Sequence, residues 1–243
     1  MRSALILIST LALAAACNMA DAQHGADEPA EPSSRQSFDV GSFDSVSLGG
    51  PYNVIVRVGP AASVRAEGDA EEIGKMEVVV ENGDLEIRRR KGERFTLGFR
   101  RNRPVTVYVT TPALRAAAIG GSGDMRIDRV EGREFAASIG GSGDMTIDSL
   151  RVGEASFSVA GSGAIRAAGT ADRSSVSIAG SGDVVVDALK SRMASVSIVG
   201  SGDVRMNAAE TAEVSIMGSG DVSVTGGAKC SVSKMGSGNV RCG

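Results

Sequence analysis

The sequence predicts an all-β protein that folds as a right-handed parallel β-helix, and three features of its second half carry this prediction. Seven Gly-Ser-Gly turns recur at intervals of 18 to 20 residues, and a fixed period of this length is typical of a repeat architecture. Apolar and polar residues alternate on both sides of each turn, as expected for two half-buried strands per repeat. Equivalent positions hold the same kind of residue in successive repeats, which favours stacking of like on like. The turns begin at Gly121, Gly141, Gly161, Gly180, Gly200, Gly218 and Gly236.

The apolar columns of the repeats identify the residues that should face the core. Valine or isoleucine stands two residues before the turn in the first six repeats, but the last repeat has Lys234. We interpret Lys234 as an end cap, because a charge at a strand edge opposes pairing with a further chain. Self-association through the C-terminal repeat remains an open alternative. Glycine at both ends of the turn is expected because a sharp corner requires positive φ, which glycine adopts without strain.

An antiparallel meander of hairpins is the competing arrangement for these strands. The β-helix is favoured because one corner of each repeat is fixed, while the opposite corner, at residues 128–133, 188–192 and 207–211, varies in length. A coil with one invariant bend and 18–20 residues accounts for both properties. We therefore predict a regular β-helix of seven repeats over residues 113–243.

The first half of the chain, residues 37–112, is less regular but also shows the alternation of strands. The sequence Glu-Asn-Gly-Asp at residues 81–84 separates two alternating runs and predicts a hairpin. Residues 49–53 stand where a degenerate first turn would be expected. We expect this half to form atypical capping coils of the same solenoid or a small sheet packed on its end.

The N-terminal residues resemble a secretory signal, with a basic residue ahead of an apolar run that is too short to span a bilayer. Two alternative processing sites are consistent with the sequence. Cleavage after Ala22 makes residues 1–22 the signal peptide, whereas a lipoprotein signal over residues 1–16 leaves a lipid on Cys17. Residues 23–36 are rich in Pro, Ala, Glu and Ser, which predicts a flexible tether. We therefore expect an exported protein, either an outer-membrane lipoprotein held by its lipid anchor or a form in the periplasm or at the cell surface.

Composition and cysteine usage narrow the choice of function. The net charge is −3, and the chain lacks the basic patch that a nucleic-acid binder needs. Cys230 and Cys242 both lie in the last repeat, where a disulfide across the coil would hold the chain end in an oxidising compartment. Two buried thiols are the alternative. The single histidine, His24, lies in the expected tether, which excludes a Ser-His or Cys-His nucleophile within the repeats.

Several short motifs follow one another in a characteristic order. Phe-x-x-Val at residues 43–46 precedes Gly-x-Tyr-x-Val at 50–54, an Asn-Gly-x-Leu-x-Ile hairpin at 82–87, Val-x-Val-x-x-Pro at 107–112 and the serial Gly-Ser-Gly-Asp turns. In this order the chain resembles the DUF2807 family, the auto-transporter adhesin head or GIN domain, over about residues 38–242. The resemblance implies a secreted or envelope β-helical domain, and it supplies no catalytic residue.

An aspartate follows most of the turns and is the one chemical motif that the repeats share. In a β-helix these residues would form a ladder with about 4.8 Å between neighbours, where a repulsion of roughly 1 kcal/mol in water needs an offset. Backbone amides of the turn are the first explanation, Ca²⁺ held by oxygen ligands is the second, and contact with a glycan is the third. We expect no cofactor and no metal site of the His/Cys type. The ladder consists of Asp124, Asp144, Asp183, Asp203 and Asp221, and it is interrupted at Ala164 and Asn239.

Together these features predict a non-enzymatic envelope domain, an adhesive, binding or structural surface module whose partner is a glycan or another envelope protein. A polysaccharide-acting enzyme is the first alternative, with Asp144 and Asp183 as a separated pair of carboxylates on either side of Ala164. A periplasmic scaffold or sensor-like module is the second.

Overall fold

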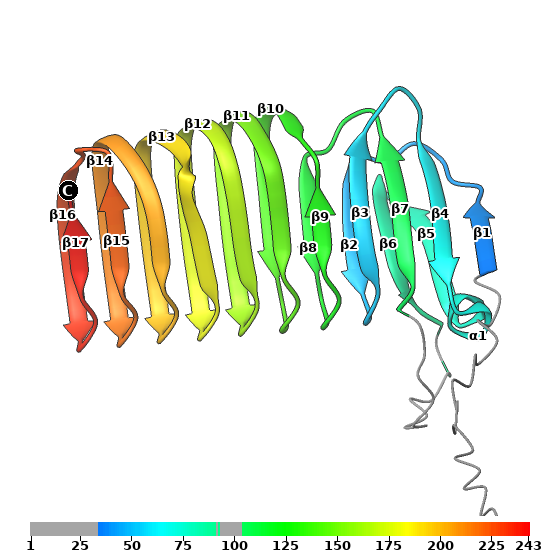
Figure 1. The fold of residues 1–243 in the computed structure, drawn as a ribbon. Helices are drawn as coiled ribbons and strands as arrows, with labels where there is room; N and C mark the ends of the chain where they lie inside the picture. The colour runs from blue at the N-terminus through cyan, green and yellow to red at the C-terminus, as the bar shows by residue number, and fades with distance from the viewer. Residues whose placement is uncertain (1–33, 91, 93–103) are drawn as a thin grey trace, which may run out of the picture. The chain divides into compact units, whose positions relative to one another are not determined.

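The protein forms a solenoid in which one sheet winds around a single hydrophobic core (Figure 1). A computed structural model describes residues 34–90, 92 and 104–243. The expected signal segment, most of the expected tether and Cys17 lie outside these residues. The elements are β1 (Ser34–Phe38), β2 (Ser45–Gly49), β3 (Asn53–Val58), β4 (Ser63–Gly68), α1 (Ala70–Gly74), β5 (Met76–Glu81), β6 (Asp84–Arg89), β7 (Thr106–Thr111), β8 (Ala116–Ile119), β9 (Met125–Ile127), β10 (Val130–Ile139), β11 (Met145–Gly161), β12 (Ala164–Gly180), β13 (Asp183–Gly200), β14 (Val204–Gly218), β15 (Val222–Thr225), β16 (Lys229–Gly236) and β17 (Val240–Cys242).

The second half is a parallel β-helix, as the repeats predicted. Ile139 of β10 lies beside Val159 of β11, and Val159 lies beside Ile178 of β12. The same column continues to Ile198 and Ile216 in β13 and β14. All of these side chains are buried. Because like positions pair in parallel from coil to coil, the antiparallel meander is excluded for this half of the chain.

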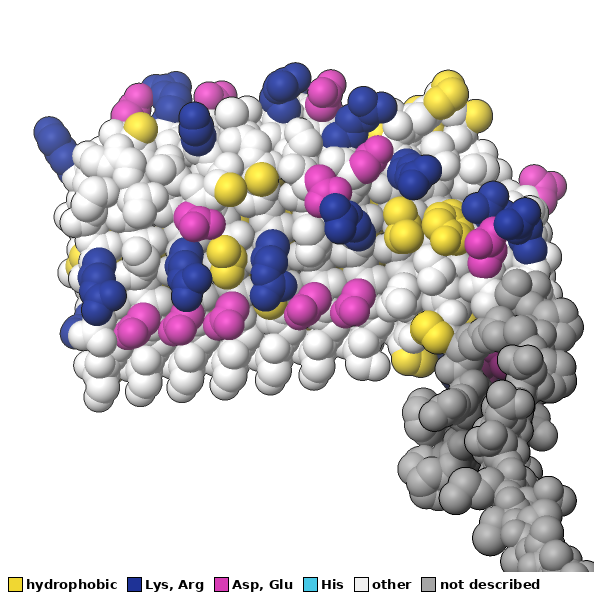
Figure 2. Space-filling view, viewed as in Figure 1, with side chains coloured by type: hydrophobic (Ala, Val, Ile, Leu, Met, Phe, Trp, Pro, Cys, Tyr) yellow, Lys and Arg dark blue, Asp and Glu magenta, His cyan; other side chains and the backbone are white. Residues whose placement is uncertain are grey.

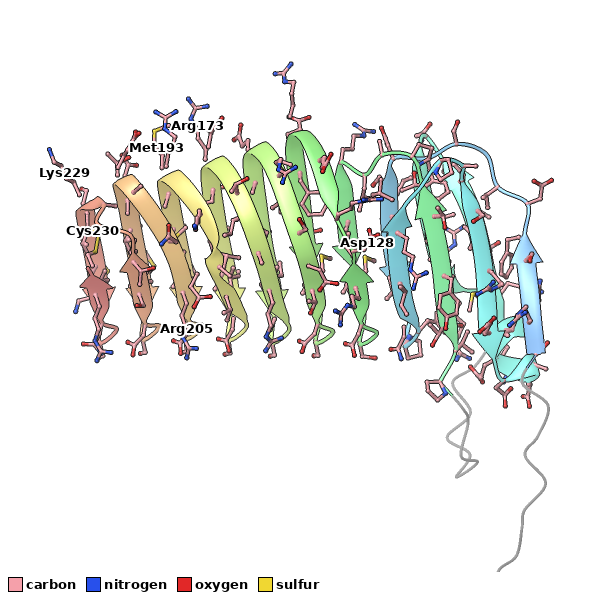
Figure 3. All side chains as sticks on the ribbon, turned by 45° about the horizontal axis from the view of Figure 1, so that its top comes forward. Asp128, Arg173, Met193, Arg205, Lys229 and Cys230 are labelled. Carbon is pink, nitrogen blue, oxygen red and sulfur yellow. A yellow bond between two sulfur atoms is a disulfide. The ribbon has the colours of Figure 1, made fainter. Side chains whose placement is uncertain are left out.

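From β11 to β14 the variable corners opposite the turns are extended strands rather than loops, whereas residues 128–129 separate β9 from β10 and residues 226–228 separate β15 from β16. Strands β11 to β14 run through the corner without a break. Where coils differ in length, the pairing register shifts, as it does between Val186 and Lys190 where β13 pairs with β14. Bulges of this kind absorb an inserted residue without ending the strand. Arg173, Met193 and Lys229 project from this corner, away from the core (Figure 3).

The glycines of the turns are required chiefly by contact between stacked backbones. The first glycine has positive φ from the third turn onward, for example 142° at Gly161. The third glycine has positive φ in none of the seven turns, all of which are described. Positive φ at both ends of the turn was therefore a wrong expectation. A Cβ atom on Gly202 would lie 2.0 Å from the carbonyl oxygen of Gly182 in the preceding coil, so the absence of a side chain is what lets the turns stack.

The N-terminal half adds two further coils. β2 pairs in parallel with β8 and β3 with β9, which places residues 49–53 in register with the first regular turn. The amide of Gly123 donates to the carbonyl oxygen of Gly50 at 3.1 Å. β6 and β7 form the next coil outward, in parallel with β2 and β3. Because β6 and β7 come later in the chain than β2 and β3, the two coils are stacked in the reverse of their sequence order.

Antiparallel strands and α1 cover the N-terminal end of this stack. β4 pairs with β7, β1 with β4, and β5 with β6 across the hairpin, where Asn82 has a φ of 53°. The Asp69 side chain accepts the amides of Glu71 and Glu72 and caps α1. β1 begins at Ser34, so the last residues of the expected tether are paired with β4. The described N-terminal region therefore contains both capping coils and an end sheet.

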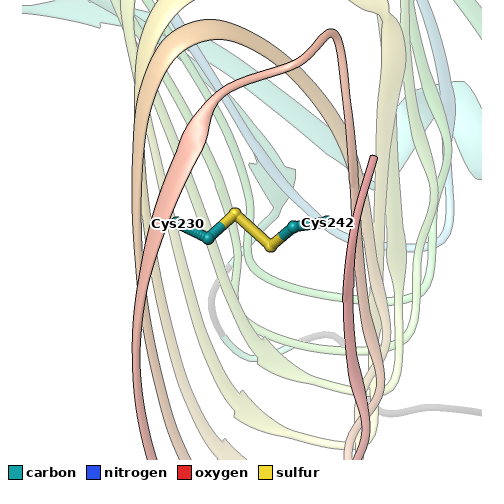
Figure 4. Close-up of a disulfide and its surroundings, with 2 residues drawn as sticks. All are labelled: Cys230 and Cys242. Carbon is teal, nitrogen blue, oxygen red and sulfur yellow. A yellow bond between two sulfur atoms is a disulfide. The ribbon is translucent and has the colours of Figure 1, made fainter.

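A disulfide joins the two strands of the C-terminal coil (Figure 4). Cys230 of β16 and Cys242 of β17 are bonded, with 6.5 Å between their Cα atoms. Lys234 is exposed, and its Nζ donates to the carbonyl oxygen of Gly238 at 2.7 Å across the turn. Val232 in the same coil is 48% exposed. The disulfide and the lysine thus stabilise a coil whose apolar residues are less covered than those of the coils before it.

Replacing Gly202 with alanine should destabilise the protein, because the new Cβ would press on the carbonyl of Gly182. Overpacking of this kind costs about 1–3 kcal/mol, and each kcal/mol lowers Tm by about 2–4 °C in a domain of this size. Gly132→Ala is the matched control, since a Cβ there meets no atom within 4 Å. Thermal unfolding monitored by circular dichroism compares the two variants. Equal melting temperatures would contradict the steric account.

Replacing both Cys230 and Cys242 with serine should loosen the last coil without unfolding the rest. The loop closed by the bond spans 12 residues, and a loop of about this size stabilises by about 2–4 kcal/mol. Amide hydrogen exchange should accelerate in β16 and β17 and stay unchanged in β12, because stability in a stacked array is local. Uniform acceleration through all coils, or none in β16, would show that the bond does not act on the C-terminal coil.

Candidate functional site

The two walls of the solenoid differ in chemistry. The segments that follow the turns form one wall, here named the charged wall, and the segments that precede the turns form the other, here named the serine wall. The charged wall comprises residues 124–128, 144–148, 164–168, 183–187, 203–207, 221–225 and 239–243. The serine wall comprises residues 116–120, 136–140, 156–160, 175–179, 195–199, 213–217 and 231–235. Figure 2 shows acidic side chains in a row along the solenoid, with basic side chains beside them.

The aspartates of the predicted ladder bind neighbouring coils to each other. Oδ1 of Asp124 accepts the amide of Asp144 at 3.0 Å, and Oδ1 of Asp203 accepts the amide of Asp221 at 2.9 Å. The same bond joins Asp183 to Asp203 at 3.0 Å. All five side chains are exposed, and the parallel register of successive coils places them in one row. These bonds satisfy backbone amides and offset the repulsion between successive carboxylates.

The two interruptions of the row have different consequences. Ala164 donates its amide to Oδ1 of Asp144 at 2.9 Å but offers no oxygen in return, so the amide of Asp183 donates instead to the carbonyl of Gly163 at 3.2 Å. Asn239 donates both its amide and its Nδ2 to Oδ1 of Asp221, at 2.8 and 3.2 Å. The row is therefore a chain of bonds between coils. Each of these carboxylates uses one oxygen in the chain and keeps the other for a further contact.

A column of arginines on alternate coils borders this row, and these arginines were not among the predicted site residues. The same position holds Thr146, Val185 and Ser223 in the intervening coils. Strand spacing places successive arginines about 9.6 Å apart. In the sequence these arginines stand five residues after the first glycine of every second turn. The pattern is hard to recognise because the residue type at this position changes from one repeat to the next. The column contains Arg126, Arg166, Arg205 and Arg241.

The arginines of this column differ in their ion pairs. Nε of Arg126 lies 3.0 Å from Oδ2 of Asp148, and Nη1 of Arg166 lies 3.5 Å from Oδ2 of Asp144. Among the described residues, Arg205 and Arg241 form no ion pair. Arg205 lies near the turns, at the opposite end of the coil from Arg173 (Figure 3). Free guanidinium groups are thus confined to the last coils of the column.

A shallow hollow of about 150 Å³ lies on the charged wall between these two free arginines. It spans three successive coils, and the buried side chains of Val204 and Val222 also line it. The hollow is open to solvent, and its character is polar. Its polar lining consists of Asp203, Arg205, Asp221, Ser223, Asn239 and Arg241.

The charged wall does not have the geometry of a metal centre. Within residues 34–90, 92 and 104–243, no three His, Cys, Asp or Glu side chains come together as ligands for a metal ion. The ladder carboxylates are instead spread along a row at one per coil, where backbone amides already offset their charge. The bonds between coils therefore favour the backbone explanation over Ca²⁺ as the origin of the ladder. The described residues also include no helix long and apolar enough to span a membrane.

The serine wall carries little charge. Serine occupies the position three residues before the turn in six of the seven repeats, and these serines are exposed. The position next to the turn becomes larger and more apolar along the chain, which leaves Val199, Met217 and Met235 exposed by 55%, 56% and 70%. Neither column offers titratable groups for catalysis.

Residues 42–228 match the model of DUF2807, a family described as "Putative auto-transporter adhesin, head GIN domain". The chain belongs to this family. The resemblance seen in the motifs of this GIN-domain protein is thereby confirmed. Among curated proteins, no sequence matches the chain.

Solved structures share the solenoid of this GIN-domain protein. A "putative adhesin" from Bacteroides fragilis has a TM-score of 0.79 at 21% identity, covering 88% of this chain and 98% of that one. A "Putative lipid binding protein" from Parabacteroides distasonis has a TM-score of 0.68 at 22% identity, covering 88% and 97%. A "putative adhesin" from Parabacteroides merdae has a TM-score of 0.64 at 15% identity, covering 88% and 97%. At these identities the likeness establishes the fold.

Asp203→Ala should lower the free energy of unfolding by about 0.5–1.5 kcal/mol, because the amide of Asp221 loses its acceptor. Asp203→Asn keeps an acceptor oxygen and should cost less. Glu213→Ala is the control, since it removes an exposed carboxylate from β14 that makes no hydrogen bond in the described structure. Urea unfolding measures all three. An Asp203→Ala protein as stable as the control would show that the ladder bond contributes nothing.

Proposed function

We propose that the protein is a non-enzymatic adhesive module of the cell envelope that holds a repetitive polymer along its charged wall. The observation that carries the proposal is the repetition of the wall itself. Side chains of one kind recur along it at the coil spacing of about 4.8 Å or at twice that spacing. A polymer with its own regular repeat would meet the same groups again and again, and weak contacts repeated along one ligand combine into a stable complex.

The state of the carboxylates supports binding rather than catalysis. Glycoside hydrolysis requires two carboxyl groups in different environments, so that one is protonated while the other is ionised. Asp144 and Asp183, the pair considered for an enzyme, lie in the same exposed row as the other aspartates. Like them, each accepts a backbone amide of the next coil. Neither lies in a cleft that would exclude water.

Membership of the GIN-domain family supports the adhesive part of the proposal, because the family and two of the three structural neighbours reported above have adhesin-like descriptions. The family also suggests an exported or surface protein. The disulfide between Cys230 and Cys242 fits such a location, since bonds of this kind persist in oxidising compartments. Lipidation of Cys17 or cleavage after Ala22 would decide whether the module is anchored or free.

Binding of polysaccharides to the immobilised mature protein tests this proposal, with reducing ends measured in the same samples. We expect retention of at least one polysaccharide class without new reducing ends. Asp144→Ala and Asp183→Ala should each reduce retention by less than about twofold, because each removes one contact among many. Release of reducing ends that either substitution abolishes would establish an enzyme. Retention of no polysaccharide in the panel would contradict the adhesive function.

A further inference from the structure

We propose that the hollow between Arg205 and Arg241 is a binding site for a polysaccharide that carries carboxylates, such as one built from uronic acid sugars. This inference rests on the proposed function and specifies both the class of polymer and the part of the wall that recognises it.

The distribution of charge selects this part of the wall. In the first coils the arginines are engaged by aspartates, as Arg126 is by Asp148. Arg205 and Arg241 form no ion pair in the described structure, and the hollow lies between them. Each therefore offers a planar guanidinium to an incoming anion, and a guanidinium binds a carboxylate through two parallel hydrogen bonds.

The edge of the charged wall that lies away from the turns also becomes less acidic towards the C-terminal coils. Seven residues after the start of each turn, the early coils have Asp128 and Asp148, and the fourth coil has Asp187. The next two coils have Asn207 and Thr225, with Nδ2 of Asn207 donating to Oγ1 of Thr225 at 3.2 Å. The carboxylate side chains that would repel an anion are thus replaced by neutral side chains at two of the three coils that contribute to the hollow.

The remaining aspartates distinguish a sugar polymer from a denser polyanion. Asp203 and Asp221 line the hollow together with the two arginines, so the charges of these four residues cancel. Nucleic acid, with a charge on every unit, would place phosphates beside both carboxylates as well as beside the arginines, and the carboxylates would repel them. A sugar has hydroxyl donors, and Asp203 and Asp221 each keep one oxygen free of the ladder bond to accept them.

Spacing and shape fit a polymer with one anionic group every second unit or so. The two arginines stand two coils apart, about 9.6 Å. Ser223 lies between them and is small enough to leave the hollow open, while Asn239 adds an amide at the edge. The site would therefore hold two carboxylates at its ends and the hydroxyl groups of the intervening sugars in its middle.

Titration calorimetry with an oligosaccharide of defined length in which glucuronic acid alternates with a neutral sugar tests the site, and the methyl ester of the same oligomer is the matched uncharged probe. We expect the wild-type protein to bind the acid at least about tenfold more tightly than the ester, since each charge-assisted bond contributes about 1.5–3 kcal/mol and 1.4 kcal/mol corresponds to a factor of ten. Affinity should also fall as salt is added.

The double variant Arg205→Ala/Arg241→Ala should weaken binding of the acid by about tenfold or more. Arg173→Ala/Lys229→Ala is the matched control, because it removes two positive charges from the opposite corner of the coils (Figure 3) and should change affinity by less than about twofold. Arg205→Lys should weaken binding to a lesser extent, since it keeps the charge but loses the planar fork. All of the replaced side chains are exposed, and Tm verifies that the variants remain folded.

The outcomes separate this inference from the function on which it rests. Equal binding of acid and ester, or equal affinity of the double variant and the matched control, overturns the site. Retention of neutral polysaccharides alone also overturns the site but leaves the adhesive function intact. If no polysaccharide of any class is retained, the adhesive function fails and the inference fails with it.

Discussion

The structure depends on direct contact between the backbones of successive Gly-Ser-Gly turns. The carbonyl oxygen of one turn receives an amide from the next, as Gly180 does from Ser201 at 2.8 Å. At this separation a Cβ atom on the third glycine of the turn would overlap the carbonyl below it. The contact fixes the distance and the register of the coils at one corner. The opposite corner can then vary in length, because bulges take up the difference.

Because the register is fixed, equivalent residues of successive coils form columns, and the residue types in these columns determine the surface chemistry of each wall. The aspartates show how structure and surface chemistry are linked. One oxygen of Asp203 holds the next coil through the amide of Asp221, while the rest of the carboxylate stays at the surface. A row of like charges is therefore tolerated because backbone amides compensate it. The arginines of the neighbouring column do not take part in these bonds between coils. Arg205 and Arg241 also form no ion pair in the described structure, so their guanidinium groups are available to a ligand.

Repetition explains how much of this could be predicted from the sequence. The turns, the buried column from Ile119 to Ile216 and the ladder of aspartates each recur with mostly one kind of residue, so their period and their stacking from coil to coil are readable without coordinates. The reversed stacking of β6 and β7 outside β2 and β3 was not predictable in this way, because it depends on pairing between segments that share no repeat. The arginine column was missed because its residues alternate, and the hollow because it requires three coils to be placed side by side.

The role of the third glycine illustrates a different limit. Positive φ is a property of one residue and can be guessed from a glycine in a turn. The close approach of Gly202 to Gly182 joins residues 20 positions apart, and it becomes visible only when the coils are stacked. Similarly, an aspartate after a turn suggests a bond within its own turn. The bond it makes is to the equivalent residue of the next coil.

Hydrogen exchange of individual amides in wild-type and Asp203→Ala proteins tests the central claim, that the carboxylates of the ladder are structural acceptors between coils. The amide of Asp221 should be protected in the wild type although its side chain is exposed, and it should exchange about tenfold faster or more in the variant, given a bond of about 1.4 kcal/mol. The amide of Asp144, four coils earlier and beyond the interruption at Ala164, should not change. Unprotected amides in the wild type, or a change spread evenly over the ladder, would contradict the account.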